Sequence, residues 1–221
     1  MIGAMADPND ILKSLADAVV GLTPELVVEL CRQALAEGLP ADKAMTEGLA
    51  AGMKLVGEKY AAREYYVPEV LLAARAMYSG FDVLKTRMAP GELRTAKGKV
   101  AFGVVQGDMH DIGKNIVRVM VQASGFEVTD LGRNVPVRAF VEAAENGVQV
   151  IGLSSLMTTT MVRMPEVVKA LDKAGLRPGV KVIVGGAPVT KGFADSIGAD
   201  GWAQDAHSAV TLIEQLTRSG S

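Results

Sequence analysis

The second half of this 221-residue chain alternates short apolar runs with longer helical stretches, and this alternation limits the folds that are open to it. The candidate strands are rich in β-branched residues and span 99–105, 126–131, 148–153, 181–184 and 201–203. The stretches with helical spacing between and after them span 113–124, 137–146, 160–174, 190–197 and 205–217. Consecutive strand–helix units predict a five-stranded parallel sheet covered by helices on both faces, in a flavodoxin-like or Rossmann-like α/β domain.

The first half shows helical periodicity throughout, with apolar residues recurring every three or four positions. Short loops separate four such stretches, which predicts a four-helix bundle in front of the α/β domain. A polar segment that contains proline and glycine follows the last of these helices. We therefore predict a helical domain at 1–90, a linker at 91–98 and the α/β domain at 99–221.

Composition excludes several classes of function. Lys and Arg number 23 against 25 Asp and Glu, so a broad basic surface for nucleic acid is not expected. No apolar run approaches the roughly 20 residues that span a bilayer, and the first residues lack a signal-peptide pattern, so we expect a cytoplasmic protein that does not enter the membrane. Cys31 is the sole cysteine, and His110 and His207 are the only histidines. These counts exclude an internal disulfide and a metal site built on several histidines.

Polar residues and glycines gather in the loops that follow four of the predicted strands: 106–113, 154–160, 185–188 and 204–206. In open parallel sheets, ligands bind beyond the carboxyl ends of the strands, where such loops meet. None of the loops carries the G-x-x-x-x-G-K-[S/T] or G-x-G-x-x-G pattern of nucleotide sites. The pattern therefore predicts a ligand site at this edge with a different chemistry.

The loop after the first strand contains the spacing Asp108-x-His110-x-x-Gly113. The imidazole of His110 can leave the surface at such a turn, and Asp108 could accept the proton of its other ring nitrogen. A carboxylate in that position orients a metal-ligating histidine and raises its basicity. One histidine cannot hold a free metal ion, but it can be the single protein ligand of a metal held by a macrocycle. Gly113 would leave room for a group that passes alongside.

Residues 107–117 resemble the D-x-H-x-x-G signature of cobalamin-binding domains. Residues 154–156 resemble the S-x-L element of that family, and residues 185–186 its G-G element. The helical half resembles the cap of methionine synthase and of the small corrinoid proteins of methyltransferase systems, in segments 47–60 and 65–68. The resemblance covers nearly the whole chain, and the motifs occur in the order of the family.

The resemblance implies a role for each matching residue. His110 is expected to be the lower axial ligand of cobalt, with Asp108 hydrogen-bonded to it and Thr160 completing a relay in which methionine synthase has a serine. The remaining expected contacts to the cobalamin are Gly107, Met109, Asp111, Gly113, Ser154, Leu156, Thr158, Gly185, Gly186 and Ala206 in the α/β domain, and Tyr60 and Val67 in the cap. The last two would cover the upper face of the cofactor.

Each assignment has a plainer alternative. His110 could be a solvated histidine, and Asp108 a turn or helix-capping residue. The hydroxyl residues after the third strand could cap the next helix, and Gly185 and Gly186 could form an ordinary turn. Tyr60 and Val67 could fill the core of the bundle.

The function that the resemblance implies is that of a corrinoid methyl carrier. Cobalt(I) would accept a methyl group from a methylated substrate through a substrate:corrinoid methyltransferase. A corrinoid:acceptor methyltransferase would then pass it to an acceptor such as tetrahydrofolate or a thiol, and a reductive activator protein is a third expected partner. The donor could be methanol, a methylamine, glycine betaine or an aryl methyl ether. The alternatives are a cobalamin-dependent sensor or regulator, the cobalamin subunit of a carbon-skeleton mutase, and a flavodoxin-like module without a cofactor.

Overall fold

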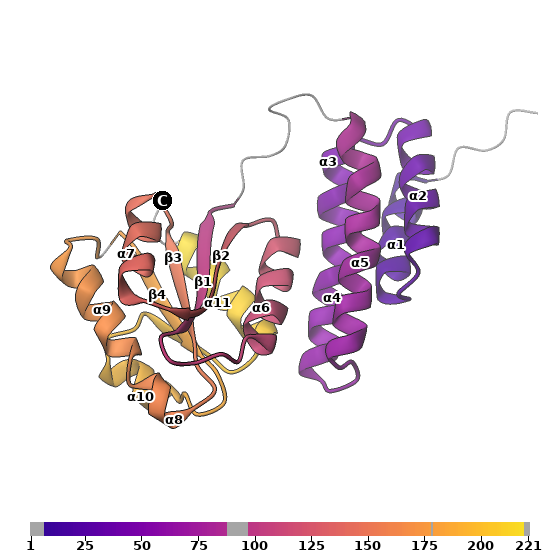
Figure 1. Cartoon of the computed structure of the whole chain (residues 1–221). Coiled ribbons are helices and arrows are strands. Elements are labelled where there is room, and N and C mark those ends of the chain that lie inside the picture. The colour runs from indigo at the N-terminus through magenta and orange to yellow at the C-terminus, as the bar shows by residue number, and fades with distance from the viewer. Residues whose placement is uncertain (1–6, 88–96, 178, 219–221) are drawn as a thin grey trace, which may run out of the picture. The chain divides into compact units, whose positions relative to one another are not determined.

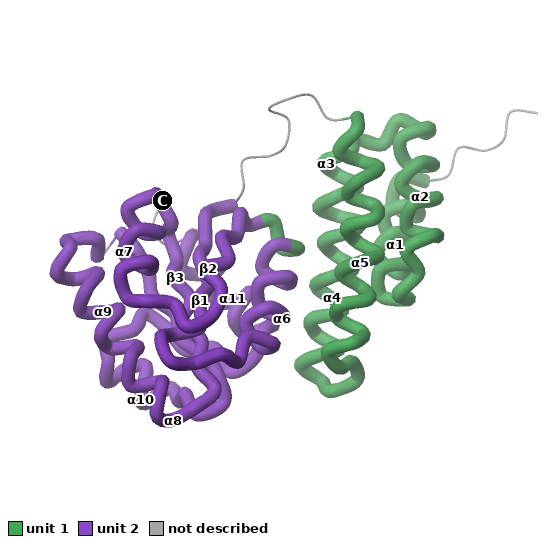
Figure 2. Tube along the Cα trace, in the orientation of Figure 1, with its two compact units in different colours: residues 1–96, 123–125 green, residues 97–122, 126–221 purple. Residues whose placement is uncertain are grey.

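The computed structural model describes residues 7–87, 97–177 and 179–218. The chain divides into two compact units, a helical one and an α/β one, which Figure 2 distinguishes by colour. The predicted domain boundary at residue 90 and most of the predicted linker 91–98 lie outside the described residues.

The helical unit is built from amphipathic helices. Its elements are α1 (Pro8–Val20), α2 (Pro24–Ala36), α3 (Ala41–Lys43), the π-helix η1 (Ala44–Leu49), α4 (Ala50–Ala61), α5 (Val67–Leu84) and the 3₁₀ turn η2 (Lys85–Arg87). Because α3, η1 and α4 follow one another without interruption, they form one long helix with a π-helical segment in it. Proline lies in the first turn of α1, α2 and α5, where its missing N–H costs no hydrogen bond.

Glycines let the helices of this unit approach one another closely. A Cβ on Gly52 of α4 would lie 2.7 Å from Cβ of Val19 in α1, and a Cβ on Gly80 of α5 would lie 2.7 Å from Cγ1 of Val27 in α2. Cys31 is fully buried among these helices, so it packs as a small apolar residue, as its position on an apolar helical face predicts. Burial raises the pKa of the Cys31 thiol to about 12.

The α/β unit contains the predicted five-stranded parallel sheet, in the order β2-β1-β3-β4-β5 (Figure 1). The strands are β1 (Lys99–Val105), β2 (Glu127–Val135), β3 (Val150–Ser154), β4 (Lys181–Gly185) and β5 (Gly201–Ala203). The helices are α6 (Ile112–Ala123), α7 (Val137–Glu145), α8 (Thr158–Met161), α9 (Met164–Lys173), α10 (Lys191–Ser196) and α11 (Ala206–Arg218). One apolar core joins the sheet to α7, α9 and α10, and a second joins it to α6 and α11, so helices cover both faces.

Two elements differ from their sequence-based prediction by more than one or two residues at an end. The single helix predicted at 160–174 is broken into α8 and α9, because Pro165 in the first turn of α9 has no N–H to donate to the preceding turn. Strand β2 continues four residues beyond the predicted end at 131. It is an edge strand with an irregular register and a positive φ of 86° at Gly132, so its polar residues face outward and hide the strand pattern.

Candidate functional site

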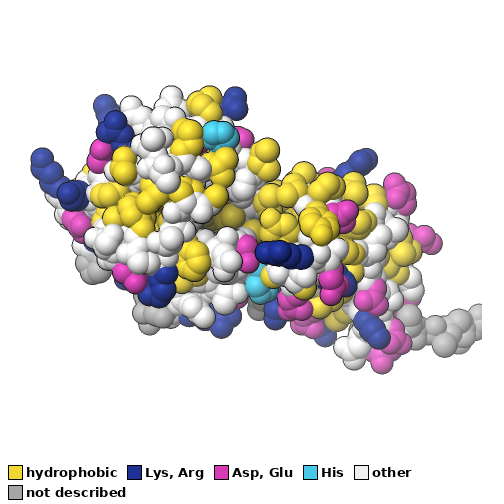
Figure 3. All heavy atoms as spheres, turned by 90° about the horizontal axis from the view of Figure 1, so that it is seen from below, with side chains coloured by type: hydrophobic (Ala, Val, Ile, Leu, Met, Phe, Trp, Pro, Cys, Tyr) yellow, Lys and Arg dark blue, Asp and Glu magenta, His cyan; other side chains and the backbone are white. Residues whose placement is uncertain are grey.

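The carboxyl ends of the strands form one edge of the α/β unit, and apolar side chains are exposed there. In the described part of this unit, the large apolar side chains that are exposed rather than partly buried are Met109, Ile112, Leu156 and Val162. All four lie in the loops after β1 and β3 or beside them, and Ile112 is 70% exposed. Figure 3, which looks at the molecule from below the view of Figure 1, shows apolar side chains gathered on this face. An apolar area around polar loops is typical of a surface that a ligand covers.

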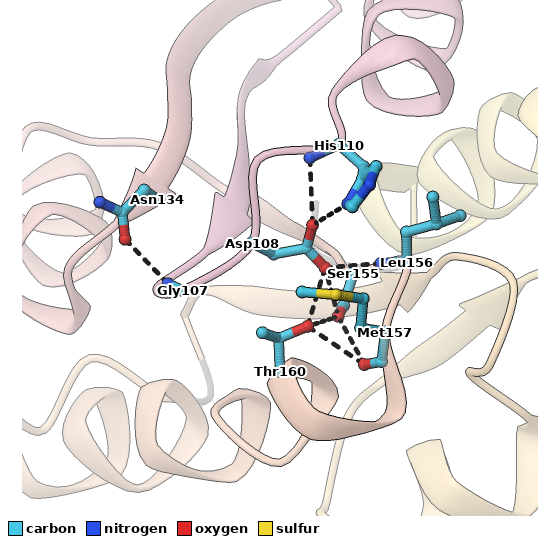
Figure 4. Close-up of polar contacts among 8 residues, drawn as sticks. All are labelled: Gly107, Asp108, His110, Asn134, Ser155, Leu156, Met157 and Thr160. Carbon is cyan, nitrogen blue, oxygen red and sulfur yellow. Dashed lines mark hydrogen bonds and ion pairs between the residues drawn. The ribbon is translucent and has the colours of Figure 1, made fainter.

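At the centre of this edge, a buried carboxylate holds a histidine (Figure 4). Oδ1 of Asp108 lies 2.8 Å from Nδ1 of His110 and accepts a hydrogen bond of 3.0 Å from the His110 backbone N–H. Asp108 is fully buried, whereas 51% of the His110 side chain is exposed. This contact places the proton of the neutral imidazole on Nδ1 and leaves the lone pair of Nε2 for a ligand.

The second oxygen of the same carboxylate accepts from the loop after β3. Oδ2 of Asp108 lies 2.7 Å from the backbone N of Leu156, 2.8 Å from Oγ1 of Thr160 and 3.0 Å from Oγ of Ser155. Burial alone would raise the pKa of Asp108. The hydrogen bonds from His110, Leu156 and Thr160 outweigh that effect and hold the pKa well below its usual range. Asp108 is therefore an anion with both oxygens in use.

Asn134, near the end of β2, fixes the start of this loop. Its Oδ1 accepts a hydrogen bond of 2.8 Å from the Gly107 backbone N–H, and its own backbone N–H donates to the carbonyl oxygen of Asp108 at 2.9 Å. Both Gly107 and Asn134 have a positive φ, of 89° and 53° respectively, a conformation that glycine and asparagine tolerate best. The loop that carries His110 is thus attached at two points to the neighbouring strand.

Two glycines of the predicted site have different structural requirements. Gly186 has a φ of 118°, and a Cβ on it would lie 1.9 Å from the carbonyl oxygen of Ser155, so the fold itself demands glycine there. A Cβ on Gly113 would meet no protein atom within 4 Å, and its φ is not in the left-handed region. Packing within the described chain therefore gives no reason for glycine at 113, as expected if a ligand uses that space.

An ion pair between a buried lysine and a partly exposed aspartate attaches α6 to the edge strand. Lys114 of α6 is 3% exposed and is paired with Asp130 of β2, and the Arg118 Nε lies 3.6 Å from the other oxygen of Asp130. Burial raises the pKa of Asp130. The Lys114 ammonium, the Gly132 N–H and Arg118 together lower it by more than burial raises it, so the net shift of the pKa is downward. The pair holds the first turn of α6, and with it the end of the His110 loop.

The structure brings the predicted catalytic residues Asp108, His110 and Thr160 into one network. Leu156 joins it through its backbone N–H while its side chain is exposed. The other predicted contacts lie around this network or in the helical unit. In the loop after β1 and the start of α6, Gly107 and Met109 flank Asp108, Asp111 precedes α6 and Gly113 is the second residue of α6. At the ends of the other elements of this unit, Ser154 ends β3, Thr158 begins α8, Gly185 ends β4, Gly186 follows Gly185, and Ala206 begins α11. In the helical unit, Tyr60 lies in α4 and Val67 begins α5.

The structure also adds two residues that the sequence-based reasoning did not single out, Ser155 and Asn134. The alternative interpretation, in which Thr160 caps a helix, does not hold. Thr160 lies within α8, is 7% exposed and donates a hydrogen bond from its hydroxyl to Asp108. Among residues 7–87, 97–177 and 179–218, no group of three or more His, Cys, Asp or Glu side chains could hold a metal ion by itself. No described helix is both long enough and apolar enough to span a bilayer.

Comparison with known proteins identifies the family. Two family models, each described as a B12 binding domain, match residues 98–211 and residues 11–85. Dimethylamine corrinoid protein 3 of Methanosarcina acetivorans is 43% identical, over 96% of this chain and 99% of the relative. The trimethylamine corrinoid protein of Methanosarcina barkeri is 42% identical, over 95% of this chain and 98% of the relative.

Solved structures agree with this. A cobalamin-binding protein from Desulfitobacterium hafniense superposes with a TM-score of 0.78 at 32% identity, over 95% of this chain and 98% of that one. The methanol:cobalamin methyltransferase complex of Methanosarcina barkeri contains a match with a TM-score of 0.82 at 29% identity, over 96% of this chain and 81% of that one. Both units of the chain and the loops around His110 are therefore accounted for by one family: the chain belongs to the B12-binding corrinoid proteins, and its cofactor is a corrinoid.

Proposed function

We propose that this chain is the corrinoid subunit of a methyltransferase system and carries methyl groups between partner enzymes on a cobalt that His110 ligates. The observation that carries this proposal is the contact of 2.8 Å between Nδ1 of His110 and the buried Oδ1 of Asp108. It fixes one nitrogen of an exposed imidazole as the donor to the carboxylate and directs the other to a ligand. When bound, the corrinoid supplies the cobalt centre that accepts and releases the methyl group.

The residues at this edge of the sheet fit such a cofactor. A corrin ring is broad and has apolar ring carbons and methyl groups beside its amide side chains, and these apolar groups suit the exposed side chains of Met109, Ile112 and Leu156 around His110. The cofactor also carries a long nucleotide tail, which needs a path past the loops. The open space at Gly113 supports such a path beside α6.

Within this proposal the protein orients the metal ligand. Asp108 keeps the proton on Nδ1 of His110 and places a full negative charge behind the imidazole, which strengthens Nε2 as a donor to the metal. Thr160 and the Leu156 N–H hold the carboxylate in place. We assign the remaining predicted contacts of the α/β unit to the ring and the tail, and Tyr60 and Val67 of the helical unit to the upper face.

A carrier of this kind works with methyltransferases, and the relatives indicate which donor to test first. Two relatives at 42–43% identity are named for dimethylamine and trimethylamine, while the match in the methanol:cobalamin methyltransferase complex is 29% identical. We therefore propose a methylated amine as the donor, used through a substrate:corrinoid methyltransferase. A corrinoid:acceptor methyltransferase and a reductive activator protein complete the proposed set of partners.

Spectroscopy of the reconstituted protein tests the ligation. The apoprotein is mixed with hydroxocobalamin, the excess is removed, and the absorption spectrum is compared for wild type, His110→Ala and His207→Ala. We expect a base-off spectrum with histidine ligated to cobalt in the wild type and in His207→Ala, a matched control because it removes the only other histidine. Loss of that spectrum in His110→Ala supports the proposal. An unchanged spectrum in His110→Ala, or no binding by the wild type, contradicts it.

The donor is tested separately, by supplying the loaded and reduced wild type with candidate donor methyltransferases. Each is offered a methylated amine or methanol, and methylation of the cobalt is followed by absorption. Methylation with the amine alone supports the amine assignment, and methylation with methanol alone overturns it.

A further inference from the structure

Ser155 is a buried hydroxyl at the centre of the network to which the mechanism above gives no task. It is 1% exposed, and its Oγ lies 3.0 Å from Oδ2 of Asp108 and 2.8 Å from Oγ1 of Thr160. Thr160 also contacts the same carboxylate oxygen, at 2.8 Å. Two hydroxyls therefore share one carboxylate oxygen and touch each other (Figure 4).

Counting protons shows what the pair can do. Ser155 and Thr160 each have one hydroxyl proton, and each lies within reach of two acceptors, Oδ2 of Asp108 and the carbonyl oxygen of Met157. The two hydroxyl oxygens lie 2.8 Å apart, so either hydroxyl can also donate its proton to the other. When one does so, the hydroxyl that accepts can still donate its own proton to the carboxylate. The two residues are geometrically equivalent donors to Asp108.

The backbone around Ser155 keeps its hydroxyl in place. The Ser155 N–H donates to the carbonyl oxygen of Gly185 at 3.2 Å. Gly186 packs so closely on the Ser155 peptide that a Cβ there would lie 1.9 Å from its carbonyl oxygen. The G-G element thus positions Ser155 from the neighbouring strand, in addition to any contact that it makes with the cofactor.

We propose that Ser155 is a second positioning residue for His110, and that Ser155 and Thr160 form a hydroxyl pair in which either member can hold Oδ2 of Asp108. A carboxylate fixed at Oδ2 keeps Oδ1 on Nδ1 of His110 and so keeps Nε2 available to the metal. Loss of one hydroxyl therefore weakens this orientation, and loss of both weakens it more. The inference rests on the proposed function only for the statement that Nε2 binds cobalt, since the orientation of His110 belongs to the apoprotein.

The first test measures the tautomer of His110 in the apoprotein by NMR of ¹⁵N-labelled histidine at alkaline pH. The chain has only two histidines, so His207→Ala assigns the signals. The variants are Ser155→Ala, Thr160→Val, the double variant, and Thr159→Ala as a control from an exposed hydroxyl in the same turn. We expect the ratio of the Nδ1–H to the Nε2–H tautomer to fall about threefold in each single variant and by more than about tenfold in the double variant, since hydrogen bonds to charged groups are the strong ones. Thr159→Ala leaves the ratio unchanged.

The same variants, loaded with hydroxocobalamin, give the fraction with histidine ligated to cobalt. We expect this fraction to follow the tautomer ratio, and Thr160→Ser, which keeps a hydroxyl, to match the wild type. The inference is overturned if the double variant equals Thr160→Val, or if Ser155→Ala equals Thr159→Ala. The comparison of Ser155→Ala with Thr159→Ala tests the inference even if the double variant does not fold. Failure of the proposed function gives a different result: the loaded wild type then shows no histidine ligated to cobalt, whatever tautomer ratio the apoprotein has.

Discussion

Replacing Gly113 by alanine should affect the stability of the apoprotein and its affinity for the corrinoid in opposite directions. Gly113 is the second residue of α6, and a Cβ there meets no protein atom within 4 Å. Alanine is favoured over glycine in a helix by up to about 1 kcal/mol, so Gly113→Ala should raise the free energy of unfolding of the apoprotein by up to that amount. If the corrinoid tail passes through this space, the added methyl must be accommodated against it. Overpacking of this kind costs about 1–3 kcal/mol, or a roughly 5- to 150-fold weaker affinity.

Urea denaturation of the apoprotein measures the first effect, and absorption titration with hydroxocobalamin measures the second. Gly192→Ala is the matched control, because Gly192 is the second residue of α10 and a Cβ there also meets nothing within 4 Å. We expect the control to be as stable as the wild type or more so, and to bind the corrinoid as the wild type does. Equal affinity in Gly113→Ala and Gly192→Ala would refute the argument that the open space at 113 belongs to the cofactor.

Three further predictions follow from local geometry. Gly186→Ala should lower the free energy of unfolding by at least about 2 kcal/mol in urea titrations, because of a positive φ and a clash with Ser155; a neutral variant would contradict this. Cys31, with a pKa of about 12, should resist iodoacetamide at about pH 8 and react once urea unfolds the chain; rapid native labelling, followed by mass spectrometry, would show that the helical unit opens. The lowered pKa of Asp130 stabilises the fold above the ordinary carboxyl pKa of about 4, and this contribution is lost as the pH falls through the folded pKa. Asp130→Asn, which unpairs Lys114, should therefore be less stable at neutral pH but lose less stability between about pH 5 and pH 3; an equal loss in both proteins would rule out this role.

The number and the parallel direction of the strands could be predicted from the sequence, because each interior strand is a short apolar run followed by a helical stretch. Strand β1, buried on both faces, was predicted with the bounds that the structure has. The end of β2 could not be predicted in the same way. An edge strand has one side open to solvent, so Gly132, Arg133 and Asn134 read as a loop although β2 continues through them to Val135, which pairs with β1.

The candidate site was predictable to the extent that one loop contains it. Asp108 and His110 are two residues apart, so a local pattern suffices to predict their contact, and Thr160 followed from the family resemblance. Ser155 and Asn134 reach the same network from 47 and 26 positions away from Asp108. Their contacts depend on the register of β3 and β2 against β1, which a single sequence does not specify.

Ser155 and Asn134, which the sequence analysis did not single out, are both held by a particular backbone conformation. Gly186 cannot carry a side chain because the Ser155 peptide lies against it, so a glycine that is required at 186 implies a fixed backbone at 155. Asn134 adopts a positive φ that asparagine tolerates better than most residues, and this conformation brings both its amide oxygen and its backbone N–H to the His110 loop. In each case the residue that touches Asp108 is set by a backbone constraint on a neighbouring strand. The orientation of the His110 imidazole is therefore a property of three parallel strands rather than of the D-x-H-x-x-G loop alone.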